Sequence, residues 1–261
     1  MDLIKSANSK YTEYENLLLE RDQLIKEAGQ IWTVYLQLFG RLMADSYEEK
    51  LACIKCKKII SYYQNALNHG GVVDSAAMEQ YLEQEMAEYY ANLRRMMNEN
   101  EDAENAGTST PYEAERAKTL YRRLAKLIHP DINPETDHSP ELQELWNRVL
   151  IAYHHNDVKE LSELEVLARR VLKELGVESV RVDIPDIEEK IEEVRTEIDR
   201  ITHSEPYSLK YLVEDETAAE KRKSELREEL EFYQKYHREL NAVILRMLQS
   251  GGLNIHVKGT D

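Results

Sequence analysis

Glycine, proline and phenylalanine are scarce in this chain. Its 261 residues include 9 glycines, 6 prolines and 2 phenylalanines, whereas 32% of the residues are charged. Leucine, glutamate and tyrosine are abundant instead, and this composition favours long helices with solvated faces. The sequence therefore predicts an all-α protein, and its length allows one to three domains.

Long apolar runs are also missing. No segment approaches the roughly 18 consecutive apolar residues that indicate a membrane-spanning helix, so we expect no contact with a membrane. The first residues, MDLIKSANSKYTEYE, lack the apolar core of a secretory signal peptide. We therefore expect the chain to be cytoplasmic, where disulfides are rare.

Positive charge is in deficit, because 34 basic residues face 50 acidic ones and the formal net charge is −16. So acidic a chain is poorly suited to the phosphates of nucleic acid, and we expect no nucleic-acid partner. The sequence contains no glycine-rich phosphate loop, no nucleophile motif and no distinct carboxylate pair. It thus predicts no enzyme activity, no cofactor and no metal.

The two cysteines, Cys53 and Cys56, have the spacing of a metal-binding or redox pair. A zinc site would need distant ligands, since the chain has no second cysteine pair. The surrounding sequence has the pattern of a helix interior and lacks the strand–helix–strand context of a thioredoxin-like motif. We therefore predict two ordinary cysteines, and an enzyme or metalloprotein that uses them is the third hypothesis for this chain.

The most informative stretch, residues 112–157, begins with an amphipathic helix pattern. Thr110, Pro111 and Glu113 match a capping box with proline at the first helical position. Apolar residues then recur at helical spacing as far as Ile128. From Arg116 to Ile128 the other face carries five cations and no acid; the cations are Arg116, Lys118, Arg122, Arg123 and Lys126. This face reverses the sign of charge that prevails in the rest of the chain.

A turn and a second helix follow. Pro130 disfavours the helical region for the preceding residue, so the first helix should end just before His129, and His129 and Asp131 should project from an exposed corner. Ser139 and Pro140 match the start of the second helix. Its apolar side comprises Leu142, Leu145, Trp146, Val149, Leu150 and Tyr153. Two amphipathic helices joined by a short loop should pack antiparallel.

This hairpin resembles the J domain of DnaJ-type co-chaperones. The matching residues are Tyr121-Arg122-Arg123-Leu124-Ala125, His129-Pro130-Asp131, Asn133-Pro134, Trp146, Val149 and Ala152-Tyr153. A lone His-Pro-Asp tripeptide would be a weak signal. Here a basic helix precedes it and an apolar helix follows it, which makes the combination specific, although it covers a minority of the chain.

The resemblance implies that the chain docks on the ATPase domain of a DnaK-type chaperone and stimulates ATP hydrolysis. The family's partner-binding tripeptide and basic face map to His129, Pro130, Asp131, Asn133, Lys118, Arg122, Arg123 and Lys126. A cationic helix face can steer an acidic partner surface, and an exposed carboxylate at a fixed turn can pair with an arginine. In this setting the histidine is a contact and orienting group, not a general base.

The chain departs from the family pattern at three places. The family often has lysine after the tripeptide, where this chain has Ile132. The family's short first helix, with its Tyr-x-x-Leu pattern, is not evident just before Pro111. The family's last helix is replaced by a longer segment, Val158–Gly176. These differences concern the edges of the domain and the strength of stimulation, whereas the tripeptide itself is intact.

The remaining sequence predicts helical arms on both sides of a J-like domain. The predicted parts are an N-terminal helical region at 1–97 with helices over 11–44, 47–67 and 75–97, an acidic linker at 98–110, the J-like domain at 111–176, and a C-terminal helical hairpin at 186–250. In the first helix a heptad-like apolar stripe is interrupted by Arg21. In the last part, apolar residues recur in steps of four and three from Ile187 to Ile201, which predicts an antiparallel coiled-coil hairpin. The arms could instead pair between two copies of the chain as a homodimer.

The sequence thus predicts a specialised DnaJ-type co-chaperone whose helical arms serve targeting, client binding or assembly. It lacks the glycine- and phenylalanine-rich segment and the cysteine-rich zinc module of the general-purpose members. The alternative is a helical scaffold or adaptor whose J-like unit docks on a partner without stimulating its ATPase. ATPase stimulation distinguishes the two hypotheses.

Overall fold

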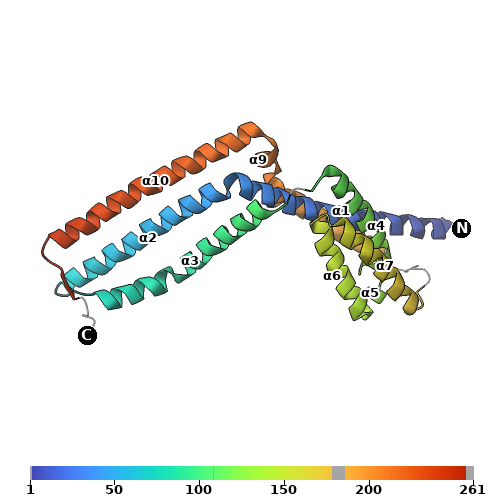
Figure 1. Ribbon diagram of the computed structural model, residues 1–261, viewed down its shortest axis with the longest axis horizontal. Helices are drawn as coiled ribbons and strands as arrows, with labels where there is room; N and C mark the ends of the chain where they lie inside the picture. The colour runs from blue at the N-terminus through green and yellow to red at the C-terminus, as the bar shows by residue number, and fades with distance from the viewer. Residues whose placement is uncertain (1, 108, 178–185, 257–261) are drawn as a thin grey trace. The chain divides into compact units, whose positions relative to one another are not determined.

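The computed structural model of the chain describes residues 2–107, 109–177 and 186–256, and most of them are helical. They form two compact units (Figure 1). Unit 1 consists of Met1–Gln30 and Gly107–Ser208, and unit 2 consists of Ile31–Ala106 and Leu209–Asp261. The prediction of an all-α protein is confirmed. Within the described ranges, no helix has both the length and the apolar character needed to cross a membrane.

One long helical segment contributes to both units. It consists of α1 (Asp2–Tyr35), the π-helical turn η1 (Leu36–Gly40) and α2 (Arg41–Asn68), which follow one another directly. The break that we expected between residues 44 and 47 is absent, and the irregularity lies at η1 instead. Asp45 and Ser46 favour helix ends but do not forbid helical backbone, so neighbouring residues that pack well can carry the helix through them.

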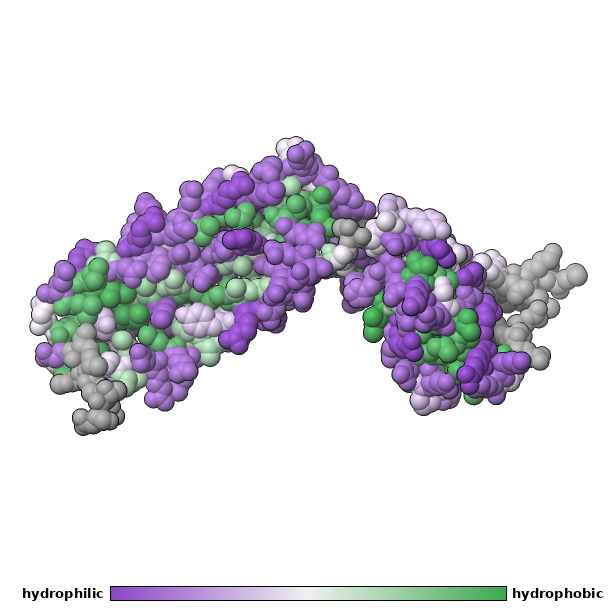
Figure 2. Space-filling view, viewed as in Figure 1, coloured by the Kyte–Doolittle hydropathy of each residue, from purple (hydrophilic) through white to green (hydrophobic). Residues whose placement is uncertain are grey.

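Unit 2 is organised around α2. Figure 1 shows α2 with α3 (Ser75–Asn105) along one side and α10 (Glu216–Gln249) along the other, and short α9 (Lys210–Glu214) leads into α10. Two short strands, β1 (Val72–Asp74) and β2 (Asn254–His256), pair in parallel beside the end of α2. Figure 2 shows apolar residues gathered in a band along this unit, between hydrophilic ridges.

Both cysteines lie on the side of α2 that faces α10. Cys53 and Cys56 are buried and free, and they pack against Leu240. The Cys53 thiol donates a hydrogen bond to the Tyr233 carbonyl oxygen at 3.4 Å. Burial raises the pKa of both thiols, which disfavours the reactive thiolate. The predicted helix-interior position of the pair is confirmed.

The C-terminal helices pair differently from the prediction. We expected helices over 186–201 and 214–249 to form one hairpin. In the structure α8 (Ile187–His203) packs in unit 1 against Tyr14 and Leu18 of α1, whereas α10 packs in unit 2 against α2. A heptad-like seam specifies which face a helix buries, but not which helix covers that face. Adjacency in sequence was therefore an insufficient guide to pairing.

Helix α3 is longer than predicted and includes most of the expected acidic linker. We placed its end near Met97, but it continues to Asn105. Ala103 is buried, and its carbonyl oxygen accepts a hydrogen bond from Gln37 Nε2 at 2.8 Å. Glutamate and alanine are good helix formers, and no glycine or proline stops the helix before Gly107.

The core of unit 1 lies between α4 (Pro111–Ile128), α6 (Pro140–His154) and α7 (Val158–Glu174). The capping box of α4 is confirmed, because Thr110 Oγ1 accepts from Glu113 N at 3.2 Å while the Glu113 carboxylate accepts from Thr110 N at 2.9 Å. Ser139 caps α6 in the predicted way. The fully buried members of this core include Ala117, Leu124, Ile128, Leu142, Val149, Leu161, Leu164 and Ala168. These contacts fix the ends of α4 and α6, between which the candidate site lies.

Candidate partner-docking site at the His-Pro-Asp turn

The turn after α4 is held in one conformation by its own hydrogen bonds. His129 leaves the helix with extended backbone (φ −66°, ψ 128°), as expected for a residue before proline. Its carbonyl oxygen accepts from Ile132 N at 2.9 Å and from Asn133 N at 2.7 Å. Its ring Nδ1 accepts from Asp131 N at 3.0 Å. The position of Asp131 is thus set directly by the histidine.

Asn133 stabilises the turn from inside. Its side chain is buried, with Nδ2 donating to the Leu127 carbonyl oxygen at 2.7 Å and Oδ1 accepting from Glu135 N at 3.1 Å. The short helix α5 (Glu135–His138) begins at this point. Asn133, which the family resemblance placed among the partner contacts, has the local role of tying the turn to the end of α4.

The histidine does not project into solvent, and this part of the prediction is wrong. His129 is only 3% exposed, and its ring lies edge-on to Trp146 with the ring centroids 4.7 Å apart. Its Nε2 is 3.5 Å from Asp22 Oδ2 of α1. The hairpin alone would leave this corner open, but α1 covers it. The Asp131 side chain is 44% exposed, so exposure of the carboxylate is confirmed.

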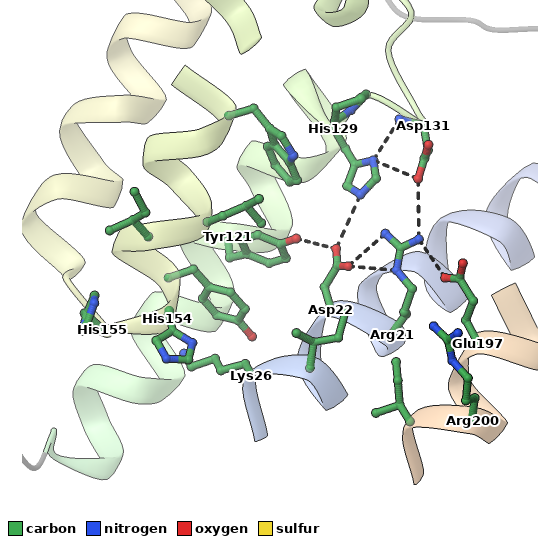
Figure 3. A pocket seen from close by; sticks show the side chains of 17 residues that line it. Arg21, Asp22, Lys26, Tyr121, His129, Asp131, His154, His155, Glu197 and Arg200 are labelled. Carbon is green, nitrogen blue, oxygen red and sulfur yellow. Dashed lines mark hydrogen bonds and ion pairs between the residues drawn. The ribbon is translucent and has the colours of Figure 1, made fainter. Parts of the chain in front are cut away.

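Asp22 is the centre of the polar network under the turn (Figure 3). Its carboxylate accepts hydrogen bonds from the Tyr121 hydroxyl and from Arg21 Nε and Nη2, at 3.1 and 3.0 Å. Burial raises the pKa of Asp22, but the bonds and charges of His129, Arg21 and Tyr121 together lower it more, so the net shift is downward. Burial, reinforced by the Asp22 charge, raises the pKa of Tyr121. Asp22 is thus held as a carboxylate.

Arg21 extends this network to the exposed edge of the turn. Its Nη1 lies 3.7 Å from Asp131 Oδ2 and 3.4 Å from Glu197 Oε2 of α8. Figure 3 shows the guanidinium between these two carboxylates and Asp22. Arg21, which interrupts the apolar stripe of α1, is therefore the residue that pairs with the Asp131 carboxylate of the tripeptide.

The cationic face of α4 is partly neutralised within the chain. Lys126 Nζ is 2.6 Å from Glu15 Oε1 of α1, and Arg123 Nη2 is 2.8 Å from Glu165 Oε2 of α7. Arg122 is exposed, and neither it nor Arg116 or Lys118 forms an ion pair within the described ranges. The cations with no acidic partner in the described structure are therefore Arg116, Lys118 and Arg122.

A groove of about 810 Å³ opens beside the turn, between α1, α6 and α8. Its apolar lining includes Ile25, Trp146, Leu150, Ile151 and Ile201, and its polar lining includes Lys26, His154 and Arg200. The Lys26 ammonium is buried, donates to Asn156 Oδ1 and lies 3.7 Å from the centre of the Tyr153 ring. Burial, together with the charge of Lys118, lowers the pKa of Lys26 to about 8.

The functional contacts that sequence reasoning missed come from α1. Glu15, Arg21 and Asp22 lie far from the tripeptide in sequence, and only the interrupted stripe at Arg21 marked this part of α1 as unusual. Ile132 stands where the family often has lysine, and the sequence alone did not explain why an apolar residue occupies this position. The structure buries it to 1% exposure beneath α1 and α8.

Among the described residues, no group of three or more histidine, cysteine, aspartate or glutamate side chains is arranged to hold a metal ion. The site consists of a fixed turn, a partly free cationic helix face and a covering helix.

No protein-family model, no curated protein and no solved structure matches this chain, so its function is inferred from this geometry and from the sequence motifs.

Proposed function

We propose that the chain is a DnaJ-type co-chaperone, which docks on a DnaK-type ATPase chaperone and stimulates its ATP hydrolysis. One observation carries the proposal. A His-Pro-Asp turn, fixed by hydrogen bonds, joins two packed amphipathic helices, and the helix before it carries five cations and no acid between Arg116 and Ile128. Each of these parts could arise alone by chance, but their combination matches the family's docking unit.

The cations of α4, Asp131 and His129 have different roles in the proposed docking. Arg116, Lys118 and Arg122 attract an acidic partner surface over a distance set by ionic strength. The half-exposed Asp131 carboxylate, now paired with Arg21, can exchange to an arginine of the partner. His129 acts through Asp131, whose backbone N–H it binds, and is a positioning residue. ATP is hydrolysed by the partner, so this chain needs no catalytic group.

The second candidate is a scaffold or adaptor that docks through the same unit without stimulating the ATPase. It is favoured by the burial of His129 and by the internal pairing of Asp131 and Lys126. A histidine that is covered by α1 cannot reach a partner while α1 is in place. The two candidates share the docking surface and differ in the response of the partner.

The test is single-turnover ATP hydrolysis by a DnaK-type chaperone from the same organism, together with a direct binding measurement. We expect the intact chain to stimulate hydrolysis, the His129→Gln variant to lose stimulation, and Arg122→Glu to weaken binding most at low salt. Lys173→Glu is the matched control, because it reverses a charge at an exposed cation of α7 that, like Arg122, forms no ion pair within the described ranges. Binding without stimulation would favour the scaffold, and the absence of both would exclude both candidates.

A further inference from the structure

We propose that residues 15–26 of α1 are an internal latch on the docking site, which must leave the His-Pro-Asp turn before a DnaK-type chaperone can dock. The latch regulates the site assigned above, so this proposal rests on the co-chaperone function. It follows from two sets of contacts, one apolar and one polar, that α1 makes with the turn and with α4.

The apolar contact is made by the residue that immediately follows the tripeptide. Ile132 is 1% exposed and lies in a cluster with Tyr14 and Leu18 of α1 and with Ile191 and Val194 of α8. On a hairpin that stood alone, this side chain would face water, where an apolar residue contributes nothing to the turn. Its burial requires α1 and α8, so the departure from the family's usual lysine has a structural purpose here.

The polar contacts engage the same groups that the proposed docking uses. Glu15 binds Lys126, Asp22 lies against His129, and Arg21 binds Asp131. Two of these latch residues are acidic, as an acidic partner surface would be. While Glu15 and Asp22 are in place, the charge of Lys126 is already paired and the His129 ring is covered. Binding of α1 and binding of the partner are therefore mutually exclusive at these positions.

The latch can open without dismantling the rest of unit 1. The core between α4, α6 and α7 is formed by the side chains of those helices, and among the described apolar residues of α1 only Leu19 packs against it, partly buried. Opening the latch also breaks the hydrogen bonds from the Tyr121 and Tyr153 hydroxyls to Asp22 and Gln23, while the apolar packing of the core stays in place. The outer contacts are between partly exposed groups, since the side chains of Lys126 and Asp131 are 58% and 44% exposed. Such ion pairs contribute little individually and can exchange with the charges of a partner.

Only molecules with an open latch can complete docking. The apparent affinity for the partner is therefore the intrinsic affinity multiplied by the fraction of molecules that are open. Arg116, Lys118 and Arg122 form no ion pair with the described side chains of α1, so a first electrostatic encounter remains available in the closed state. Docking then proceeds as the acidic partner replaces Glu15 and Asp22. Loosening the latch should raise stimulation at a limiting concentration of the chain, and locking it should abolish stimulation.

Two independent variants loosen the latch in the full-length chain. Ile132→Ser removes the apolar anchor, with Ile132→Val as the conservative control. Glu15→Lys places like charges together at Lys126, with Glu20→Lys as the control, because Glu20 is an exposed position on the same helix. Serine is used at position 132 because a lysine there could itself contact the partner.

A third variant locks the latch. The side-chain tips of Glu15 and Lys126 are 2.6 Å apart, so cysteines at both positions can be joined by a reducible bifunctional thiol reagent. Cys53 and Cys56 are buried and compete poorly for the reagent. Hydrogen exchange at the amides of α1, α6 and α7 reports directly whether α1 has been released and whether the core of unit 1 is intact.

We expect Ile132→Ser and Glu15→Lys to speed exchange in residues 11–26 without affecting α6 or α7, and to raise stimulation at limiting concentration by roughly threefold or more, as a larger open fraction requires. The controls should match the parent chain. Crosslinking should reduce stimulation to the basal rate, and reduction should restore it. If Ile132→Ser also disturbs α6 and α7, Glu15→Lys decides the question.

The negative outcomes separate the two proposals. A parent chain that stimulates equally well before and after crosslinking would overturn the latch and leave the co-chaperone function standing. Faster exchange in α1 without a gain in stimulation would overturn the latch in the same way. If neither the parent nor any loosened variant stimulates a DnaK-type chaperone from the same organism, the co-chaperone function fails, and the latch proposal fails with it.

Discussion

Removing one hydroxyl group from Tyr121 should reveal how much the Asp22 network contributes to unit 1. The Tyr121 ring is 1% exposed and is stacked on Tyr153, with the centroids 4.0 Å apart. The Tyr121→Phe variant keeps that packing and loses only the hydrogen bond to the Asp22 carboxylate. Hydrogen bonds to charged groups contribute about 1.5–3 kcal/mol. Because Arg21 remains bound to Asp22, we expect a loss of about 2 kcal/mol in the free energy of unfolding.

Tyr153→Phe is the matched control. The Tyr153 hydroxyl donates to the neutral Gln23 Oε1 at 2.6 Å, also on α1, and a bond between neutral groups contributes about 1 kcal/mol. Urea unfolding can be followed for unit 1 alone through the fluorescence of Trp146, in a Trp32→Phe background that removes the tryptophan of unit 2. A cost for Tyr121→Phe no greater than that for Tyr153→Phe would contradict a central role for Asp22.

The pH dependence gives a second check on the same bond. The pKa of Asp22 lies below its ordinary value of 3.8 in the folded chain. A group with a lowered folded pKa stabilises the fold above its ordinary pKa, and this contribution is lost as the pH falls through the lowered value. The difference between Tyr121→Phe and Tyr153→Phe should therefore persist at pH 5 and shrink below about pH 3.8.

Three further changes have defined outcomes. A Cβ atom at Gly40 would collide with the Asn100 side chain, so Gly40→Ala should cost about 1–3 kcal/mol in unit 2, and Asn100→Ala should recover most of that loss in the double variant. Leu164 is fully buried in unit 1, so Leu164→Ala should cost about 2–5 kcal/mol in urea unfolding; a smaller loss would mean that the three-helix core is looser than described. Burial, the neighbouring histidine and Lys26 lower the pKa of His154, so its contribution is present above its ordinary pKa and is lost as the pH falls through the lowered value. The urea midpoint of unit 1 should fall less between pH 7 and pH 5 in His154→Asn than in the parent, and equal falls would exclude this histidine as the cause.

The sequence predicted those features that depend on a few neighbouring residues. The starts of α3, α4 and α6 follow from side chains that bind backbone amides within three positions, at Asp74, Thr110 and Ser139. The end of α4 follows from the constraint that Pro130 places on His129. Such interactions do not depend on the rest of the fold, so their pattern in the sequence is a reliable guide.

Features set by distant helices could not be predicted in the same way. Burial of His129 depends on α1, and the apolar stripe of α1 did not indicate that it covers this turn. The seam of α10 was equally compatible with α8 and with α2. In the sequence, only Arg21 and Ile132 indicated that another helix packs against the turn. Each is unfavourable in the setting that local sequence suggests, the first in an apolar stripe and the second at an exposed turn.

The pairing of α2 with α10 also has a consequence for synthesis of the chain on the ribosome. The Cys53 thiol binds a carbonyl oxygen that is added 180 positions later, which at about 5–20 residues per second is a delay of roughly 10–35 s. All of unit 1 emerges before α10 does, because unit 1 ends at Ser208 and α10 begins at Glu216. During that interval α3 can cover one side of α2, but the side that packs against α10, which includes Cys53 and Cys56, has no helix to cover it. Pausing or early termination within α10 would therefore yield chains with a complete unit 1 and an aggregation-prone α2.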